Sequence, residues 1–269
     1  NSINAVDILL TQLEELSISG YTLKNDDIKF AIRLVAEDRS IKIKPIFLER
    51  ITVSPKKGFI TPKSETQREF IQSVRQVDIV LAIGPAGTGK TYLAVALAVE
   101  GLLKRQFKKI ILVRPAVEAG EKLGFLPGDI TEKINPYFMP LYDSLDDVLE
   151  AEKVRELMEN GTIEIAPLAY MRGRTLNDSF VILDEAQNST NEQMKMFLTR
   201  LGFNSKMVIT GDVTQIDLDN TKKSGLIQVQ SLLKNINGIR FANFSEKDVI
   251  RHDLVKQIIK AYSQNGLGK

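Results

Sequence analysis

The sequence contains no cysteine and a single histidine, His252, among its 269 residues. The absence of cysteine excludes disulfides and metal sites with thiolate ligands, and one histidine argues against a metal centre built on imidazoles. No apolar run approaches the roughly 20 residues that cross a bilayer, so we expect no membrane association, and no signal peptide is recognisable. Neither charge predominates, with 36 basic against 34 acidic residues, so net charge does not call for a nucleic-acid partner. An ordinary globular composition remains, compatible with a reducing compartment.

The length permits one large domain and a small appendage. Residues 1–38 are predicted to form a small N-terminal helical region, with amphipathic helices over 5–16 and 26–37. Because the chain begins at Asn1 rather than at a methionine, we expect this region to be truncated. Residues 39–63 are predicted to be an extended basic linker, which proline and glycine punctuate. It could contact RNA or the acidic surface of a partner, or it could be a plain solvated connector.

Residues 64–269 alternate between apolar runs and helical patterns. Most of the apolar runs are continuous, as expected for parallel strands that are covered on both faces. The alternation predicts an α/β fold with a doubly wound, mostly parallel sheet. The predicted strands are 78–83, 109–113, 162–165, 180–183, 206–210 and 239–242, and the predicted helices are 92–103, a region within 130–160, 191–201, 226–235 and 246–263.

Residues 84–91 read GPAGTGKT and match the phosphate-binding pattern G-x-x-x-x-G-K-[ST]. The glycines let the backbone curl so that its N–H groups point at phosphates. Lys90 is expected to reach the β and γ phosphates, and Thr91 to place its hydroxyl on Mg²⁺. A strand pattern precedes the motif and a helical pattern follows it, which argues against a chance glycine-rich turn. The predicted nucleotide-binding residues of this loop are Gly84, Pro85, Ala86, Gly87, Thr88, Gly89, Lys90 and Thr91.

The strand pattern over 180–183 ends in two acids, Asp184 and Glu185, which is the Walker B arrangement. Asp184 is expected to hold Mg²⁺ directly or through water. Glu185 lies where a carboxylate can act as a base toward water that attacks the γ phosphate. A strand that ends in two acids can also simply cap the next helix, but the phosphate loop favours the functional interpretation. Activation of water indicates hydrolysis rather than transfer to a small molecule.

Two glutamines are further candidates. Gln215 follows the strand pattern 206–210 and can contact the γ phosphate or its attacking water, while Asp212 can orient Gln215 or metal-bound water. An ordinary turn is the alternative for this segment. Gln67 precedes the first core strand, and its amide, which both donates and accepts, can read the edge of adenine and so select ATP. The alternative for Gln67 is a solvated helix position.

Longer blocks carry a resemblance to a known family. Residues 114–129, 165–176, 193–202 and 248–252, together with GPAGTGKT and ILDEAQN, resemble the PhoH family of phosphate-starvation-inducible-type P-loop ATPases, in its PhoH-like or PhoL form. The resemblance covers about residues 60–263. It implies a three-layer RecA-like P-loop NTPase core similar to those of superfamily 1 helicases.

The resemblance also assigns motifs. Gln67 is similar to the adenine-reading Q motif, residues 84–91 to motif I, 114–115 to motif Ia, 184–187 to motif II and 211–215 to motif III. The family relation further implies a bacterial cytoplasmic protein that is linked to RNA metabolism and to ribosome-related ribonuclease work. The N-terminal region resembles the RNA-binding-like region of the family only in part.

One RecA-like lobe supplies half of a helicase-type ATP site. The resemblance therefore implies a homo-oligomer, in a ring or a filament, in which a neighbouring subunit supplies an arginine to the transition state. Arg251 and Arg174 are the favoured candidates, and Arg172, Arg200 and Arg240 are the others. Arginines on a loop could equally bind RNA phosphates or form ordinary salt bridges.

The sequence leads to two functional hypotheses. In the first, the chain is a Mg²⁺-dependent ATPase that couples hydrolysis of ATP to RNA remodelling or to an RNA-processing partner. Its predicted catalytic residues are Lys90, Glu185, Gln215 and Arg251. In the alternative, ATP switches a binding module that controls oligomerisation or partner docking, without helicase activity.

Overall fold

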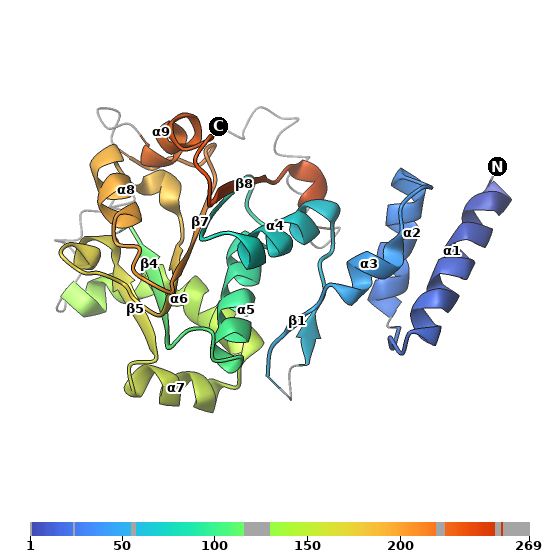
Figure 1. Ribbon diagram of the computed structural model, residues 1–269, viewed down its shortest axis with the longest axis horizontal. Helices are drawn as coiled ribbons and strands as arrows, with labels where there is room; N and C mark the ends of the chain where they lie inside the picture. The colour runs from blue at the N-terminus through green and yellow to red at the C-terminus, as the bar shows by residue number, and fades with distance from the viewer. Residues whose placement is uncertain are drawn as a thin grey trace.

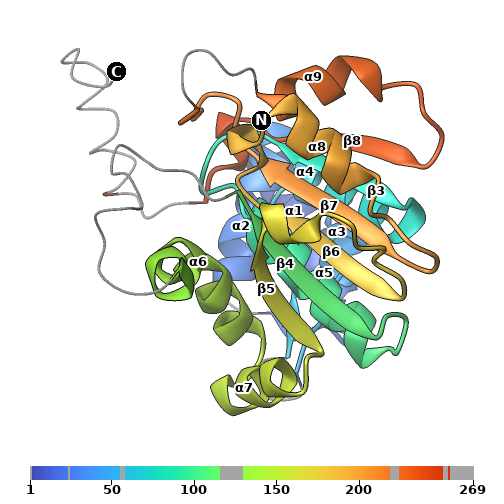
Figure 2. The ribbon, with the colours of Figure 1, turned by 90° about the vertical axis from the view of Figure 1, so that its left-hand side faces the viewer.

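The computed structural model describes residues 2–23, 25–54, 58–115, 130–218, 224–250 and 254. Its centre is a six-stranded sheet in the order β5-β4-β6-β7-β3-β8, and every neighbouring pair is parallel (Figure 1, Figure 2). The predicted α/β fold and all six predicted strands are confirmed. The strands are β3 (Ile79–Ile83), β4 (Lys109–Arg114), β5 (Ile163–Pro167), β6 (Ser179–Leu183), β7 (Lys206–Gly211) and β8 (Ile239–Asn243).

Apolar clusters cover both faces of this sheet. Because successive strand residues point to opposite faces, Val80 of β3 joins one cluster and Leu81 joins the other. Helices α4, α5, α6 and α7 pack on the first face, and α8 and α9 on the second, which gives three layers (Figure 2). The helices are α4 (Glu65–Gln76), α5 (Lys90–Leu103), α6 (Ile130–Val148), α7 (Ala151–Glu159), α8 (Asn191–Leu198) and α9 (Gly225–Leu232).

Helix α4 lies outside the predicted helices. Ser64 caps its first turn, because the Ser64 hydroxyl accepts a hydrogen bond from the Gln67 N–H at 3.2 Å. Phe70 and Val74 are buried against the sheet, whereas most other positions of α4 carry polar side chains. The apolar stripe is therefore narrow, although it is enough to fix the helix.

The helix predicted from residue 246 does not begin there. Glu246–Asp248 forms a single turn of 3-10 helix, η4, and the side chains of Ser245 and Asp248 close it as a capping box. Residues 249 and 250 continue without helical structure. The rest of that predicted helix lies outside the described residues, apart from the single residue Leu254.

The N-terminal residues have an apolar cluster separate from those of the sheet. The two predicted helices are confirmed as α1 (Ser2–Ile18) and α2 (Asn25–Glu37), and Figure 1 shows them to one side of the sheet. The prediction that residues 39–63 are extended is wrong over α3 (Ile43–Leu48). This short helix forms because it buries Phe47 in the N-terminal cluster, 5.5 Å from the ring of Phe30.

A two-stranded antiparallel sheet connects the N-terminal helices to the core. Its strands are β1 (Ile51–Thr52) and β2 (Phe59–Ile60). The Thr52 N–H donates to Oε1 of Glu100, on α5, at 3.0 Å, which fixes β1 on that helix. Within the described residues, no helix is long and apolar enough to cross a membrane.

Candidate functional site

Residues 84–91 form the loop between β3 and α5. Gly89 is the N-cap of α5 with a φ of 80°, a left-handed conformation that glycine adopts without strain. Gly84 passes so close to β8 that an added Cβ would lie 2.4 Å from the carbonyl oxygen of Phe244. The loop also bonds to β7, since the Gly84 N–H donates to the carbonyl of Gly211 at 3.1 Å. Gly89 is therefore required for its backbone conformation, and Gly84 because a side chain would collide with the backbone at Phe244.

Lys90 lies inside the curl of this loop. Its Nζ donates to the carbonyls of Gly84 and Pro85, both at 2.7 Å. Burial lowers the pKa of Lys90, while the charges of Asp212, Asp184 and Glu185 act in the opposite direction. The ammonium group thus lies within the loop, held by two of its backbone carbonyls, and Lys90 lines the cavity beside the loop.

A cluster of oxygen atoms adjoins the loop. Oδ1 of Asp184 accepts hydrogen bonds from the hydroxyl of Thr91 at 2.6 Å and from that of Thr210 at 2.7 Å. Magnesium prefers oxygen ligands and commonly takes one or two carboxylates with phosphate and water. Thr91 and Asp184 could therefore hold it, with Thr210 orienting the carboxylate. No group of three or more His, Cys, Asp or Glu side chains suited to a metal occurs in the described part of the chain.

Arg114, at the end of β4, bridges the two acids that follow β6. Its Nε donates to Oδ2 of Asp184 at 2.9 Å, and its Nη2 donates to Oε1 of Glu185 at 3.1 Å. Nη1 donates to the carbonyl of Tyr137 on α6. The side chain of Arg114 is 13% exposed and that of Asp184 only 5%. One guanidinium thus offsets part of the negative charge of the two acids from the side of α6.

Gln187 joins Glu185 to the loop after β7. Its Nε2 donates to Oε2 of Glu185 at 2.5 Å, and its Oε1 accepts the Asp212 N–H at 3.0 Å. Glu185 itself has a φ of 54°, which turns the chain sharply after β6. Asp212 is buried, and its Oδ2 has no hydrogen-bond partner among the described residues. Its Oδ1 caps the turn by accepting from Thr214.

These groups line a cavity of about 290 Å³. Lys90, Thr91, Asp184, Glu185 and Gln215 meet there, so the structure brings together these five predicted site residues. Arg114 and Asp212 line the same cavity.

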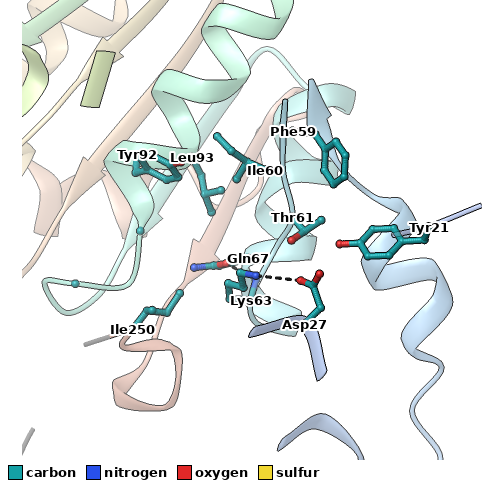
Figure 3. A pocket seen from close by; sticks show the side chains of 12 residues that line it. Tyr21, Asp27, Phe59, Ile60, Thr61, Lys63, Gln67, Tyr92, Leu93 and Ile250 are labelled. Carbon is teal, nitrogen blue, oxygen red and sulfur yellow. Dashed lines mark hydrogen bonds and ion pairs between the residues drawn. The ribbon is translucent and has the colours of Figure 1, made fainter. Parts of the chain in front are cut away.

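A second cavity, of about 490 Å³, adjoins the first across the loop. Gly87, Gly89 and Tyr92 line both cavities, so the two are neighbours on either side of the phosphate loop. The walls of the second are mainly apolar, and Figure 3 shows Ile60, Leu93 and Ile250 among the side chains that line it. A ligand with its phosphates in the loop could extend into this space.

Comparison with known proteins settles the family. Residues 59–263 match the family model described as PhoH-like protein. The chain belongs to the PhoH family. A PhoH-like protein of Bacillus subtilis is 53% identical and covers 98% of this chain and 82% of its own length. One of Synechocystis is 55% identical over 77% of this chain and 63% of its own length, and Protein PhoH of Escherichia coli is 43% identical over 76% and 58%.

The PhoH family model covers the whole parallel sheet and the phosphate loop, because β3 to β8 lie within residues 79–243. The strand of the phosphate loop, β3, and that of the acidic pair, β6, are separated by β7. The carboxyl ends of these parallel strands meet at one edge of the sheet, which is where ligands bind in open α/β sheets. The core of this PhoH-family chain is thus a three-layer α/β fold of the P-loop kind, with the phosphate loop at the carboxyl edge of a parallel sheet.

Gln67 lies between the phosphate loop and the larger cavity, and its contact with adenine stays a prediction. Its Nε2 donates to the carbonyl of Thr88 at 2.9 Å, and its Oε1 accepts the Lys63 N–H at 2.6 Å. Gln67 lines the larger cavity but is only 2% exposed. The nitrogen end of its amide therefore braces the phosphate loop at Thr88, and one N–H of the amide and one lone pair of its oxygen remain for a ligand.

The candidate arginines of this PhoH-family chain are spread widely. Arg174 forms a two-pronged pair with Glu164, at 2.6 and 2.8 Å, which raises its pKa, and the Arg200 Nη1 donates to the Arg174 carbonyl at 3.0 Å. Arg172 and Arg240 are exposed. Arg251 and His252 lie outside the described residues, so the arginine supplied by a neighbouring subunit stays a prediction.

Three site residues had no assigned role from the sequence: Arg114, Gln187 and Thr210. The family resemblance had placed Arg114 in motif Ia and Gln187 in motif II without a role for the side chain, and Thr210 is the next-to-last residue of β7. Their partners depend on which strands are neighbours, which the sequence does not state.

Proposed function

We propose that this PhoH-family chain is a Mg²⁺-dependent ATPase. The observation that carries the proposal is the convergence of Lys90, the Thr91–Asp184 pair and Glu185 on one cavity beside the phosphate loop. A lysine in a glycine-rich loop at the start of a helix suits phosphates, and paired oxygen ligands suit Mg²⁺. Belonging to the PhoH family supports the same conclusion.

The proposed reaction is attack of water on the γ phosphorus. Glu185 orients that water and accepts its proton, while the bond from the γ phosphorus to the bridging oxygen breaks and ADP and phosphate form. Lys90 stabilises the charge on the phosphate oxygens, as preorganised donors do in such sites. Mg²⁺, when bound by Thr91 and Asp184, supplies further neutralisation of phosphate charge. Gln215, which lines the cavity, is placed to contact the γ phosphate or the water.

Replacement of Glu185 by glutamine tests the reaction. Glu185→Gln keeps the shape of the side chain and removes the base, so we expect ATP to bind with little change while hydrolysis falls by about 10²–10⁴. Binding is measured by calorimetry and hydrolysis by phosphate release. Hydrolysis at the wild-type rate would remove Glu185 from the role of base.

We further propose that hydrolysis is coupled to RNA remodelling or to a ribonuclease or ribosome-related partner, in the bacterial cytoplasm. The PhoH relatives of Bacillus subtilis and Escherichia coli support a bacterial source for the chain. The active form in this proposal is a homo-oligomer in which Arg251 of a neighbouring subunit completes the site. If a dilute monomer hydrolyses ATP at the specific rate of the oligomer, a shared site is ruled out.

The second candidate is a module that ATP switches between partner-binding states. The link from Glu185 through Gln187 to the Asp212 loop favours it, because a change at the phosphate would reach a neighbouring loop. The ATPase rate with and without single-stranded RNA separates the two candidates. Stimulation by RNA supports coupling to RNA, and an unchanged rate supports the switch.

A further inference from the structure

We propose that the cavity of about 490 Å³ holds an amino-substituted purine base, and that Tyr21 and Asp27, in the N-terminal region, form its outer wall. This inference rests on the proposed function, because it assumes that a nucleoside triphosphate occupies the phosphate loop. It adds that recognition of the base depends on residues outside the sheet domain.

The position of the cavity is the first argument. It meets the phosphate-side cavity at Gly87, Gly89 and Tyr92, so a nucleotide whose phosphates lie in the loop directs its base into it. Its volume lies in the range of about 300–1,000 Å³ that is usual for small-molecule sites. In Figure 3, Tyr92 and Leu93 lie across the cavity from Tyr21 and Asp27.

The chemistry of the walls is the second argument. Apolar side chains such as Ile60, Leu93 and Ile250 can contact the faces of a planar ring. Asp27 and Lys63 add an acceptor and a donor at one side, 3.5 Å apart, and both line the cavity. A purine with an exocyclic amino group has a matching edge, since its amino group donates and its ring nitrogens accept.

Asp27 keeps capacity for a ligand although it already has partners. Its carboxylate contacts Lys63 and also Tyr21, whose pKa is raised to about 12 by burial and by Asp27. A carboxylate has about four acceptor positions, and a lysine ammonium has three donors. The side chain of Asp27 is 6% exposed, so a hydrogen bond to it would be shielded from water. Gln67, on the same cavity, uses one donor and one acceptor position of its amide on the backbone and keeps the others.

The location of Tyr21 and Asp27 gives the cavity a regulatory consequence. Tyr21 belongs to the apolar cluster of α1, α2 and α3, with its ring 5.5 Å from that of Phe47. Asp27 lies in the first turn of α2. A base bound against them would therefore stabilise the packing of the N-terminal helices on the core, and loosening of those helices would weaken the binding of the nucleotide.

Calorimetry with three probes tests the base contact: ATP, inosine triphosphate, which lacks the amino group, and inorganic triphosphate, which lacks the base. Wild type is compared with Asp27→Ala, and Asp7→Ala on α1 is the matched control, because Asp7 is exposed and lines neither cavity. We expect Asp27→Ala to weaken ATP about ten- to hundredfold, as for loss of a charged hydrogen bond, and to leave inorganic triphosphate unchanged. Equal losses for ATP and inosine triphosphate, or no loss for ATP, would overturn the proposal.

Hydrogen exchange on the wild-type protein tests the same inference without a substitution, so misfolding of a variant cannot affect the result. We expect ATP to slow exchange of the amides of residues 25–30 as well as 84–93, and inorganic triphosphate to slow that of 84–93 alone. GTP in place of ATP shows whether the pocket distinguishes the two amino-purines. Protection of 84–93 by ATP without any change at 25–30 overturns this inference and leaves the proposed function standing. If none of the probes binds, the proposed function fails as well.

Discussion

Removal of Arg114 should destabilise the protein and at the same time make its stability depend on magnesium. Arg114 is the cation that contacts both acids after β6, with its Nε 2.9 Å from Asp184. In Arg114→Met the Oδ2 atom of Asp184 loses this partner, while Oδ1 keeps the hydroxyls of Thr91 and Thr210. A buried carboxylate is then left without its counter-charge.

The magnitude follows from the burial of the pair. The side chains of Arg114 and Asp184 are 13% and 5% exposed, and breaking such a pair from one side costs about 3–5 kcal/mol. The contact with Glu185 adds little, about 0–1 kcal/mol, because that carboxylate is 43% exposed. For a chain of this size the melting temperature should fall by about 6–20 °C.

Calorimetric melting without nucleotide, with and without millimolar Mg²⁺, is the assay. Mg²⁺ should restore part of the lost stability in Arg114→Met, because the cation replaces the guanidinium at Asp184, and it should change wild type much less. Arg174→Met is the control, since the Arg174–Glu164 pair is about one-third exposed on each side. We expect it to cost about 0–1 kcal/mol and to show no response to Mg²⁺. A melting temperature of Arg114→Met equal to that of wild type would refute the reasoning, as would the same response to Mg²⁺ in both.

Three other perturbations test separate parts of the structure. Gly84→Ala should cost about 1–3 kcal/mol in thermal unfolding, because its Cβ would lie 2.4 Å from the Phe244 carbonyl oxygen; an unchanged melting temperature would contradict that close approach. Phe47→Ala should cost about 3–5 kcal/mol and should loosen the N-terminal helices before the sheet domain, as exchange of their amides would report; simultaneous loosening of both would show a single cooperative unit. Tyr21 should titrate near pH 12 by ultraviolet absorbance, because burial and Asp27 both raise its pKa. A raised pKa stabilises the folded state below the unfolded value of 10, so the stability lost in Tyr21→Phe should shrink as the pH rises from 10 to 12, and a constant difference would exclude that contribution.

The strands were predictable because most are continuous apolar runs, as in β3 and β6, where all five residues are buried. Helix α4 was not, since its few apolar residues are scattered among glutamines and arginines. Helix α3 has six residues and contains Pro45, which the first turn of a helix tolerates. It depends on tertiary contacts that no local pattern reports.

The residues of the candidate site also fall into those that the sequence predicts and those that it does not. The phosphate loop and the acids after β6 have fixed spacings in the chain, so the sequence predicts them directly. The role of Arg114 depends on β4 being the neighbour of β6, and the wall of the larger cavity depends on where α2 packs. Contacts between distant segments follow from the order of strands and the packing of helices. A local motif determines neither the strand order nor the helix packing.

The amide of Gln187 has a mechanical consequence. Its nitrogen can only donate and its oxygen can only accept, so the side chain is fixed in orientation by the Glu185 carboxylate on one side and the Asp212 N–H on the other. The turn after β6 and the turn after β7, its neighbour in the sheet, are thereby connected through the side chain of Gln187. Rotation of Glu185 away from Gln187 would break one of these two hydrogen bonds and free the Gln187 side chain, so segment 211–215 would become more mobile. Faster amide exchange at residues 211–215 in Gln187→Leu would show that Gln187 restrains this turn. Unchanged exchange would show that the two turns are held independently.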